Sequence, residues 1–258
     1  MFRLLILPLL FAAVLSAQWE EVSSARYKVG YGFIDELGVA TASLYRDGDR
    51  YKILVHAKAT GFAAFLSGDR EEFYESRGTV EEGVLVPQLY RQEKRAHGDK
   101  DRTLFQFDHE EKNITVQRLR CDGKKCKENR KFHDFYAPDD LLSLYFNLEH
   151  YTDGARPGQS FRFPVVGPKK GKLDLLFPDG EKRKEVEASL GAENGEEKVM
   201  VAIVHQKIFS SDEGELFLRM GQDGVCTKAL LKNVVLFGDI HGTLEKKRQG
   251  EIGYHNRP

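Results

Sequence analysis

Residues 39–57 read VATASLYRDGDRYKILVHA, and this stretch decides the fold class of the chain. Its two flanks, Val39 to Tyr45 and Tyr51 to Ala57, have the period-two pattern of strands that bury one face. Between them lies Asp47-Gly48. This dipeptide is a strong signal for a tight hairpin turn, because glycine accepts the positive φ that such turns need. The stretch therefore predicts two antiparallel strands joined by a short turn.

The same pattern recurs outward from this hairpin in both directions. We expect strands over 26–33, 72–80, 84–95, 102–108, 113–120 and 130–136, and later over 160–166, 172–177, 182–188, 198–207, 215–220 and 231–240. Turns with glycine or polar residues separate the strands, roughly one every ten residues. The apolar run 61–68 does not alternate and is a short helical turn or a loop over the sheet edge. The sequence predicts a mainly β protein with a large curved antiparallel sheet or a partly open barrel.

One amphipathic helix is expected, over about 138–150. Pro138-Asp139-Asp140 precedes the apolar run, as is usual in a first helical turn. Apolar residues then recur at helical spacing, and they form the stripe Leu141, Leu144, Tyr145 and Leu148. A stripe of this width indicates that the helix packs on a face of the sheet.

The chain begins with a segment that resembles a secretory signal peptide. Arg3 precedes an apolar run from Leu4 to Leu15, and the small residues Ser16 and Ala17 follow. This order is typical of a leader that is removed on export, and the apolar run is short for a membrane span. We expect a signal peptide over 1–17. Cleavage after Ser16 and a retained N-terminal anchor are alternatives, because Leu15 is bulky for its position near the cleavage site.

The remainder is expected to form a single β-rich domain over 22–249, followed by a flexible tail over 250–258. Lys and Arg together number 39 and Asp and Glu 40, for a net charge of -1, so the chain has no general attraction to nucleic acid. No second long apolar run follows Ala17, and we expect no membrane span after signal cleavage. The oligomeric state stays open.

Two of the three cysteines lie close together in sequence. Cys121 and Cys126 flank Asp122-Gly123-Lys124-Lys125, a tight turn between strand-like runs. In an exported protein this spacing predicts a disulfide that clamps the hairpin, with free thiols as the alternative. The spacing suits neither a zinc site nor a Cys-x-x-Cys redox motif. Cys226 is then left over, and we interpret it as a buried free thiol.

The same hairpin is the most basic part of the chain. Its cations are Arg118, Arg120, Lys124, Lys125, Lys127, Arg130 and Lys131. They form a candidate patch for an anionic partner such as a lipid phosphate or an acidic glycan. The alternative is a solvated turn whose charges protect an exposed sheet edge from pairing with other chains.

Two acidic motifs raise the question of catalysis. Gly238-Asp239-Ile240-His241-Gly242 matches a signature of metal-dependent phosphoesterases, but too few residues follow it to supply the remaining ligands. We interpret it as a final strand that ends in a turn, with Asp239 and His241 in solvent. Asp139 and Asp140 suggest the acid pair of a glycosidase, but acids are common at a helix start. We assign no catalytic and no metal-ligating residue.

The order of the short motifs along the chain resembles that of a known family. In sequence they are Tyr27-Lys28-Val29-Gly30-Tyr31-Gly32, Gly38-Val39-Ala40, the strand from Tyr51 to Gly61, Pro87-Gln88-Leu89-Tyr90, Asp140-Leu141-Leu142-Ser143-Leu144-Tyr145 and Leu236-Phe237-Gly238-Asp239. They are similar to those of the exported bacterial proteins called domain of unknown function 3108. The resemblance implies a Gram-negative periplasmic protein with a mostly antiparallel β fold, and it carries no agreed activity or catalytic residues.

These observations together favour a periplasmic, non-enzymatic protein that uses no cofactor. A curved sheet with a helix on it can enclose an apolar pocket, so we expect a binding or carrier module for an apolar or lipid-like envelope component. A structural partner in an envelope assembly is one alternative. A metal-dependent phosphoesterase that uses Asp239 and His241 is the other.

Overall fold

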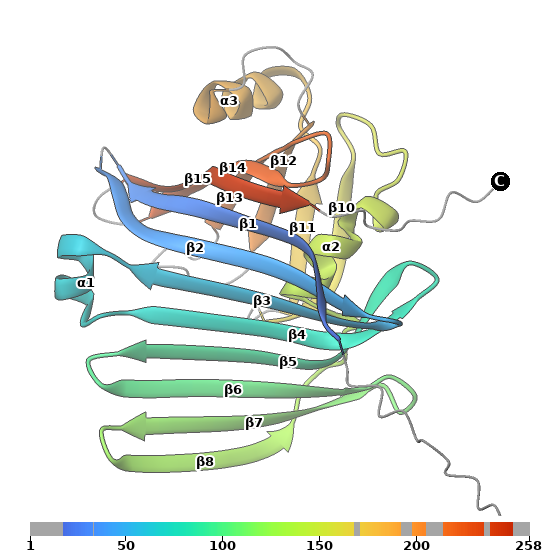
Figure 1. The fold of residues 1–258 in the computed structure, drawn as a ribbon. Coiled ribbons are helices and arrows are strands. Elements are labelled where there is room, and N and C mark those ends of the chain that lie inside the picture. The colour runs from blue at the N-terminus through green and yellow to red at the C-terminus, as the bar shows by residue number, and fades with distance from the viewer. Residues whose placement is uncertain are drawn as a thin grey trace, which may run out of the picture.

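The described residues fold into one 15-stranded sheet that bends around a central helix (Figure 1). The computed structural model describes residues 18–32, 34–167, 171–191, 198–204, 214–234 and 238–249. The expected signal peptide (1–17) and the expected tail (250–258) therefore lie outside the described residues. Within the described part, no helix is both long enough and apolar enough to cross a membrane.

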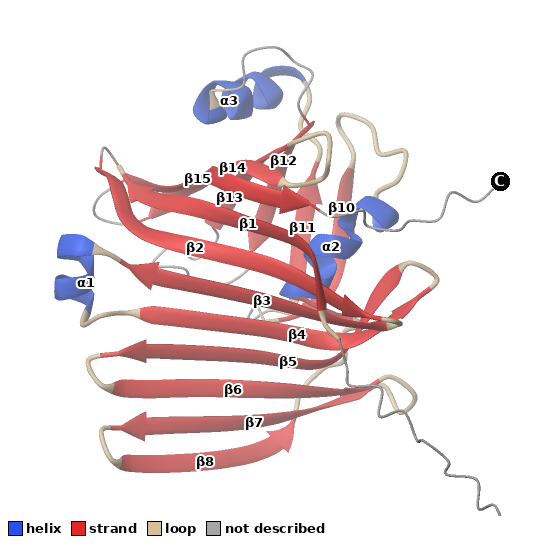
Figure 2. Cartoon of the chain, viewed as in Figure 1, coloured by secondary structure: helices blue, strands red, loops and turns tan. Residues whose placement is uncertain are grey.

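The first eight strands form a continuous meander. The last six extend the sheet on the other side of the first strand, with the final strand of the chain next to it (Figure 2). The strands of the meander are β1 (Glu20–Tyr31), β2 (Ile34–Asp47), β3 (Arg50–Ala59), β4 (Glu71–Glu81), β5 (Val84–Ala96), β6 (Asp99–Asp108), β7 (Asn113–Asp122) and β8 (Lys125–Phe132). The others are β9 (Asp139–Asp140), β10 (Ser160–Val166), β11 (Lys172–Leu176), β12 (Lys198–Val204), β13 (Gly214–Met220), β14 (Cys226–Val234) and β15 (Gly238–Gln249). The helices are α1 (Gly61–Ser67), α2 (Leu141–Tyr151) and α3 (Gly180–Leu190).

The sheet is open, with β8 at one edge and the two-residue strand β9 at the other. Strand β15 pairs with β1 and so joins the two ends of the chain in the middle of the sheet. Every neighbouring pair is antiparallel except β9 with β10. The prediction of a large curved antiparallel sheet is confirmed, and the alternative of a partly open barrel is not what forms.

The hairpin of residues 39–57 forms as the sequence indicates. Strands β2 and β3 pair in one uninterrupted register from Gly38 opposite Ala59 to Asp47 opposite Arg50. Gly48 takes a φ of 59° in the turn, which glycine adopts without the steric cost that a Cβ atom brings. Residues 61–68, left between a helical turn and a loop, form helix α1, with Gly68 as its C-cap.

Helix α2 begins three residues later than expected, because Asp140 is its N-cap. The Asp140 carboxylate accepts hydrogen bonds from the backbone N–H groups of Leu142 and Ser143 at 2.7 and 3.1 Å. Ser143 Oγ accepts one in return from the backbone N–H of Asp140, which completes a capping box. Asp139 and Asp140 are thus strand β9, and Pro138 precedes it.

Helix α2 lies inside the bend of the sheet and joins the cores on either side of it. Leu144 is 2% exposed and packs in a cluster with residues of β10 to β14, and Leu141, Tyr145 and Leu148 of the predicted stripe pack against that cluster. Leu142 packs against two further clusters, one with β5 to β7 and one with β1 to β5. The helix therefore fills the interior that the two halves of the sheet share.

The predicted strand over 182–188 is wrong, because this segment is most of helix α3. Val186 and Leu190 are both fully buried and are spaced four residues apart, as on one face of a helix. They pack on Val199, Val201 and Phe217, on the side of the sheet away from α2. Since Met200 and Ala202 pack toward α2, strand β12 is buried on both faces.

The predicted strand over 231–240 is also wrong. Its first part ends β14 at Val234, and its last part begins β15 at Gly238, with residues 235–237 outside the described residues. The expected turn at Gly238 to Gly242 is instead the start of a strand of twelve residues. This correction places Asp239 and His241 within a central strand of the sheet.

Candidate functional site

The face of the sheet that contacts α2 is called here the inner face, and it changes character along the strands. Near α2 its side chains are buried: Ile53 and Ser76 are inaccessible, and Phe105 and Val116 are each 7% exposed. Further along the same strands, toward the end that carries α1 and the β7–β8 turn, most inner-face side chains are partly or fully exposed, although Thr103 is only 8% exposed (left in Figure 1). Helix α2 thus covers only half of the inner face.

Two rows of directly paired residues run across the uncovered half, and together we call them the open half. The first row is Ala25, Ala42, Val55, Tyr74, Gln92, Thr103, Arg118 and Asn129, from β1 to β8. The second row is Leu244, Tyr27, Ala40, Ala57, Glu72, Lys94, Asp101, Arg120 and Lys127, from β15 to β8. Paired residues in antiparallel strands point to the same face, so each row is a line of neighbouring side chains.

Each row begins apolar and ends charged. On β15, β1, β2 and β3 the residues are mostly alanines, with Val55, Leu244 and Tyr27. On the same face Gly242 of β15 has no side chain, and no described atom lies within 4 Å of where its Cβ would be. Burial and the nearby Tyr145 of α2 raise the pKa of Tyr27. The apolar ends therefore combine small side chains with partial exposure.

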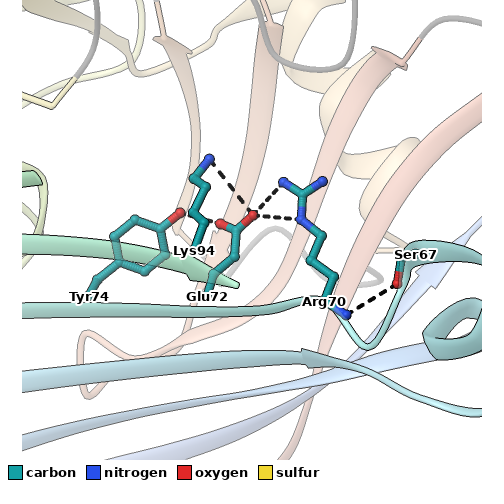
Figure 3. A network of polar contacts seen from close by, with 5 residues as sticks. All are labelled: Ser67, Arg70, Glu72, Tyr74 and Lys94. Carbon is teal, nitrogen blue, oxygen red and sulfur yellow. Dashed lines mark hydrogen bonds and ion pairs between the residues drawn. The ribbon is translucent and has the colours of Figure 1, made fainter. Parts of the chain in front are cut away.

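Glu72 lies where the apolar end of the second row meets its charged end, and Figure 3 shows its polar contacts. Its carboxylate accepts a hydrogen bond from Arg70 Nε at 2.9 Å and another from the Tyr74 hydroxyl, and Lys94 Nζ lies 3.8 Å away. Burial opposes ionisation, but the hydrogen bond from Tyr74 and the charges of Lys94 and Arg70 outweigh it and hold the pKa of Glu72 below its usual range. Glu72 is thus an anion whose charge its neighbours balance.

The register of β7 and β8 divides the basic patch of the hairpin between two faces. Val116 belongs to the core beside α2, so residues at even spacing from it on β7, and their partners on β8, lie on the inner face. Those positions hold five of the seven predicted cations, namely Arg118, Arg120, Lys125, Lys127 and Lys131. Arg130 lies on the outer face, and Lys124 is in the turn.

Cys121 and Cys126 are joined by a disulfide across the end of this hairpin. The bridge lies on the outer face, since Cys121 alternates with the inward Arg120 along β7. Cys226 is a buried free thiol, as interpreted from the sequence, and burial raises its pKa to about 11. A thiol held protonated in this way is a poor nucleophile at neutral pH.

The acids Asp139 and Asp140 are buried at the start of α2 and are bound by many donors. Asp140 accepts a hydrogen bond from Ser76 Oγ at 2.6 Å, and Asp139 accepts from Asn147 and Tyr151 at 2.9 and 3.0 Å. Burial raises the pKa of Asp140 to about 7 and that of Asp139 in the same direction. With exposures of 3% and 0%, they anchor the helix and have no room for a substrate.

Asp239 and His241 lie on the outer face of β15, opposite to the open half. Lys232 Nζ is 3.6 Å from the Asp239 carboxylate, and the His241 ring lies over Gly30, where a Cβ atom would meet it at 2.2 Å. Among the described residues, no three His, Cys, Asp or Glu side chains are grouped so that they would hold a metal ion. This arrangement gives the phosphoesterase alternative no support.

Two grooves lie on the outer face. One, of about 640 Å³, lies between the end of α1 and the β5–β6 turn, and several ionic side chains in it already have partners, such as Glu71 with Lys58. The other, of about 330 Å³, is lined by residues of both charges from β1, β2 and β15, among them Glu21 and Arg26. Neither has the apolar lining that the open half presents.

Sequence reasoning found the cations of the site but missed its apolar end. The small residues Gly38, Ala40 and Ala42 alternate along one strand opposite Ala57 of the next, which is the signal that was available. Period-two alternation marks which residues share a face, but it does not tell which end of that face a helix covers. The open half therefore emerges only from the fold.

Comparison with curated proteins and with solved structures returns no match for this chain. One family model, described as a protein of unknown function (DUF3108), matches residues 26–215. This range begins in β1 and ends in β13, so it contains α2, the basic hairpin and every residue of the two rows except Ala25 and Leu244. The family assignment is confirmed, and the chain belongs to the DUF3108 family of proteins of unknown function.

Proposed function

We propose that this protein is a non-enzymatic binding module that carries an apolar, lipid-like component of the bacterial envelope on the open half of the inner face. The observation that carries the proposal is the apolar end of the two rows. There, alanines on β1, β2 and β3 and the bare Gly242 leave the inner face partly exposed beside a fully packed core. A ligand in this place would complete the interior that α2 fills only in part.

The energetics favour an apolar occupant. Burial of apolar surface contributes about 25 cal/mol per Å², so a ligand that covers about 300 Å² of this face gains roughly 7 kcal/mol before the cost of association. Small side chains let a chain-like molecule approach the sheet closely and make many contacts. Tyr27 and Tyr74 add aromatic surface within the same two rows.

Binding rather than catalysis is proposed because the acidic groups have other tasks. Asp139 and Asp140 are enclosed by hydrogen bonds at the start of α2, and Glu72 is held ionised by its neighbours. Asp239 and His241 face away from the open half. A general acid or base needs reach to a substrate. Of these groups only Glu72 lies in the open half, and its carboxylate is already engaged by Arg70 and Tyr74.

We place this function in the periplasm. Residues 1–17 have the charge, apolar core and small-residue order of a signal peptide. A disulfide between Cys121 and Cys126 suits an oxidising compartment. Native mass spectrometry of protein purified from the periplasm of its own source tests both proposals, because the protein should lack the leader and retain an apolar ligand.

A pair of adjacent substitutions on opposite faces of β2 tests the site. Ala40 points into the open half, and Thr41 points to the outer face. In a titration with the apolar fluorophore N-phenyl-1-naphthylamine, Ala40→Trp should weaken binding at least about tenfold, because the indole occupies the ligand's place. Thr41→Trp should leave the affinity within about twofold of the parent protein.

Circular dichroism melting separates loss of binding from loss of fold. If Ala40→Trp fails to fold, Ala57→Leu adds less bulk at the neighbouring position of the same row and should weaken binding in the same direction. Equal affinities for the parent, Ala40→Trp and Ala57→Leu would contradict the proposal, as would a parent protein that does not bind the fluorophore.

The alternative of a structural partner in an envelope assembly would use an exposed sheet edge. Strand β8 is such an edge, and all eight of its residues are exposed. Five of the eight are charged, namely Lys125, Lys127, Glu128, Arg130 and Lys131. Charged side chains along an edge oppose the addition of another strand. The edge therefore favours the binding module over assembly by strand pairing.

A further inference from the structure

We propose, resting on the function above, that the ligand is an amphiphile with an anionic, phosphate-type head group, which Arg118 and Lys127 bind on the inner face of the β7–β8 hairpin. The apolar part of the ligand would then lie across β1, β2 and β3. Both rows cross from apolar residues on β1, β2 and β3 to these cations: Arg118 lies on β7 in the first row, and Lys127 is the last residue of the second row, on β8. The inference names the chemical class of the ligand and its orientation in the site.

The two ends of the open half are spaced for one molecule. From Val55 on β3 to Arg118 on β7, the first row crosses four strand spacings, about 19 Å along the sheet. Neutral polar residues, Gln92 and Thr103, lie between the aromatic Tyr74 and Arg118. The face thus changes stepwise from apolar to polar to cationic, as the surface of an amphiphile does.

The ion pairs of the second row show where positive charge is left without an anionic partner. Glu72 lies 3.8 Å from Lys94, and Asp101 lies 3.2 Å from Arg120, so the carboxylates in the middle of the row already have cationic partners. Arg118 and Lys127, by contrast, form no ion pair with any described residue. The uncompensated positive charge of the inner face is therefore concentrated at its β8 end.

The geometry of the hairpin suits a phosphate. Arg118 pairs with Asn129 and Arg120 with Lys127, so Arg118 and Lys127 occupy diagonal positions, which long side chains can bridge. A guanidinium donates two parallel hydrogen bonds to phosphate oxygens, and an ammonium adds a point charge. Because β8 is the edge strand, the head group would stay hydrated while the apolar part enters the site.

Displacement of bound N-phenyl-1-naphthylamine by decyl phosphate and by decanol tests the head group, since the two share the decyl chain and differ in the anionic phosphate. Decyl phosphate should displace the fluorophore at a concentration about tenfold or more below that of decanol at low salt. The preference should shrink in high salt, because exposed charges are screened. Inorganic phosphate alone should not displace the fluorophore, which distinguishes an amphiphile from a free anion.

Matched double variants show which face of the hairpin produces the preference for decyl phosphate over decanol. Arg118→Gln/Lys127→Gln should reduce it to about twofold or less while the affinity for decanol is unchanged. Lys124→Gln/Arg130→Gln removes the same charge from the turn and the outer face and should keep the preference. If the parent shows no preference, or both double variants lose it equally, the inference is wrong although the apolar site stands. If the parent does not bind the fluorophore, the proposed function itself fails.

Discussion

The two halves of the inner face use the same strands for opposite purposes. On β7, Ile114 and Val116 are buried beside α2, whereas Arg118 and Arg120, two and four residues further on, are exposed. The alternation of the strand is unbroken through all four, so the strand itself does not set the difference. The presence of α2 decides which half is core. A helix shorter than the sheet thus leaves a face that is shaped like an interior but not filled.

A carboxylate in each half records this difference. Asp140, in the covered half, has a pKa raised to about 7 by burial. The pKa of Glu72, in the open half, is lowered, because Tyr74, Lys94 and Arg70 outweigh its burial. The covered half is therefore a dry interior, whereas the open half keeps Glu72 ionised beside Arg70 and Lys94. This contrast is what a core and a ligand site should show.

The largest expected effect concerns the pH dependence of stability. Asp140 titrates near 4 in the unfolded chain and near 7 in the folded one, so the folded state binds more protons between these values. The free energy of unfolding should therefore fall as pH rises from about 4 to 7, by at most about 4 kcal/mol from this group. Asp140→Asn should remove most of the decline in urea denaturation across that range.

Two neighbours make this prediction specific. Asp139 shifts in the same direction, so a part of the decline should persist in Asp140→Asn. Glu72 has the opposite shift, and its stabilising contribution is complete above its unfolded pKa and is lost only at lower pH. Glu72→Gln should therefore leave the slope between pH 5 and 7 unchanged. If Asp140→Asn has the slope of the parent protein, then the covered half is not dry.

The next effect compares one leucine from each half. Leu144 of α2 is 2% exposed within the core cluster, so Leu144→Ala should lower the free energy of unfolding by about 3 kcal/mol through lost burial and a cavity. Leu244 lies in the open half and belongs to none of the core clusters, so Leu244→Ala should cost under about 1 kcal/mol. Urea denaturation monitored by circular dichroism measures both. Equal costs would mean that the open half is packed like the core.

The meander could be predicted from local sequence signals because each of its strands pairs with the next strand in the chain. The Asp47-Gly48 turn brings together two strands that are adjacent in the chain, so their register follows from the turn and the alternation. The cysteine pair was predicted in the same way, since both residues lie in one hairpin. The apolar stripe from Leu141 to Leu148 is also a local signal, and it predicted the helix. Only the first residue of the helix was misplaced, because the sequence did not show that Asp140 is the N-cap.

The failures arose where distant contacts decide. Residues 182–188 lie between segments that were predicted as strands, but Val186 and Leu190 pack together against β12 and β13 from one face of a helix. The return of β15 to β1 joins residues more than two hundred positions apart, and no local pattern encodes it. The open half depends on that return, because β15 contributes Leu244 and Gly242 to its apolar end. A face assembled from β1 and β15 is thus visible only in the fold.

The smallest expected effect concerns the disulfide at the far end of the open half. Cys121→Ser/Cys126→Ser removes a bridge that closes a loop of only a few residues. The unfolded chain then gains little entropy, so the free energy of unfolding should fall by about 2 kcal/mol or less. The hairpin lies at the sheet edge, and its strand β8 is exposed along its whole length. Hydrogen exchange should therefore increase in β7 and β8 and stay unchanged in α2, because local opening of an edge does not require the core to unfold.

The same variant shows whether the disulfide mainly stabilises the fold or mainly positions the cations of the proposed site. The bridge fixes Cys121 opposite Cys126, one position from the pair Arg120 and Lys127, so it holds the register that places the cations on the inner face. Its removal should weaken the preference for decyl phosphate over decanol even where the loss of stability is small. The reason is that a frayed hairpin spreads the positions of Arg118 and Lys127. A large loss of stability with exchange in α2 would instead make the hairpin part of the core. The covered half would then extend further along β7, toward the β7–β8 turn, than the burial of Ile114 and Val116 indicates.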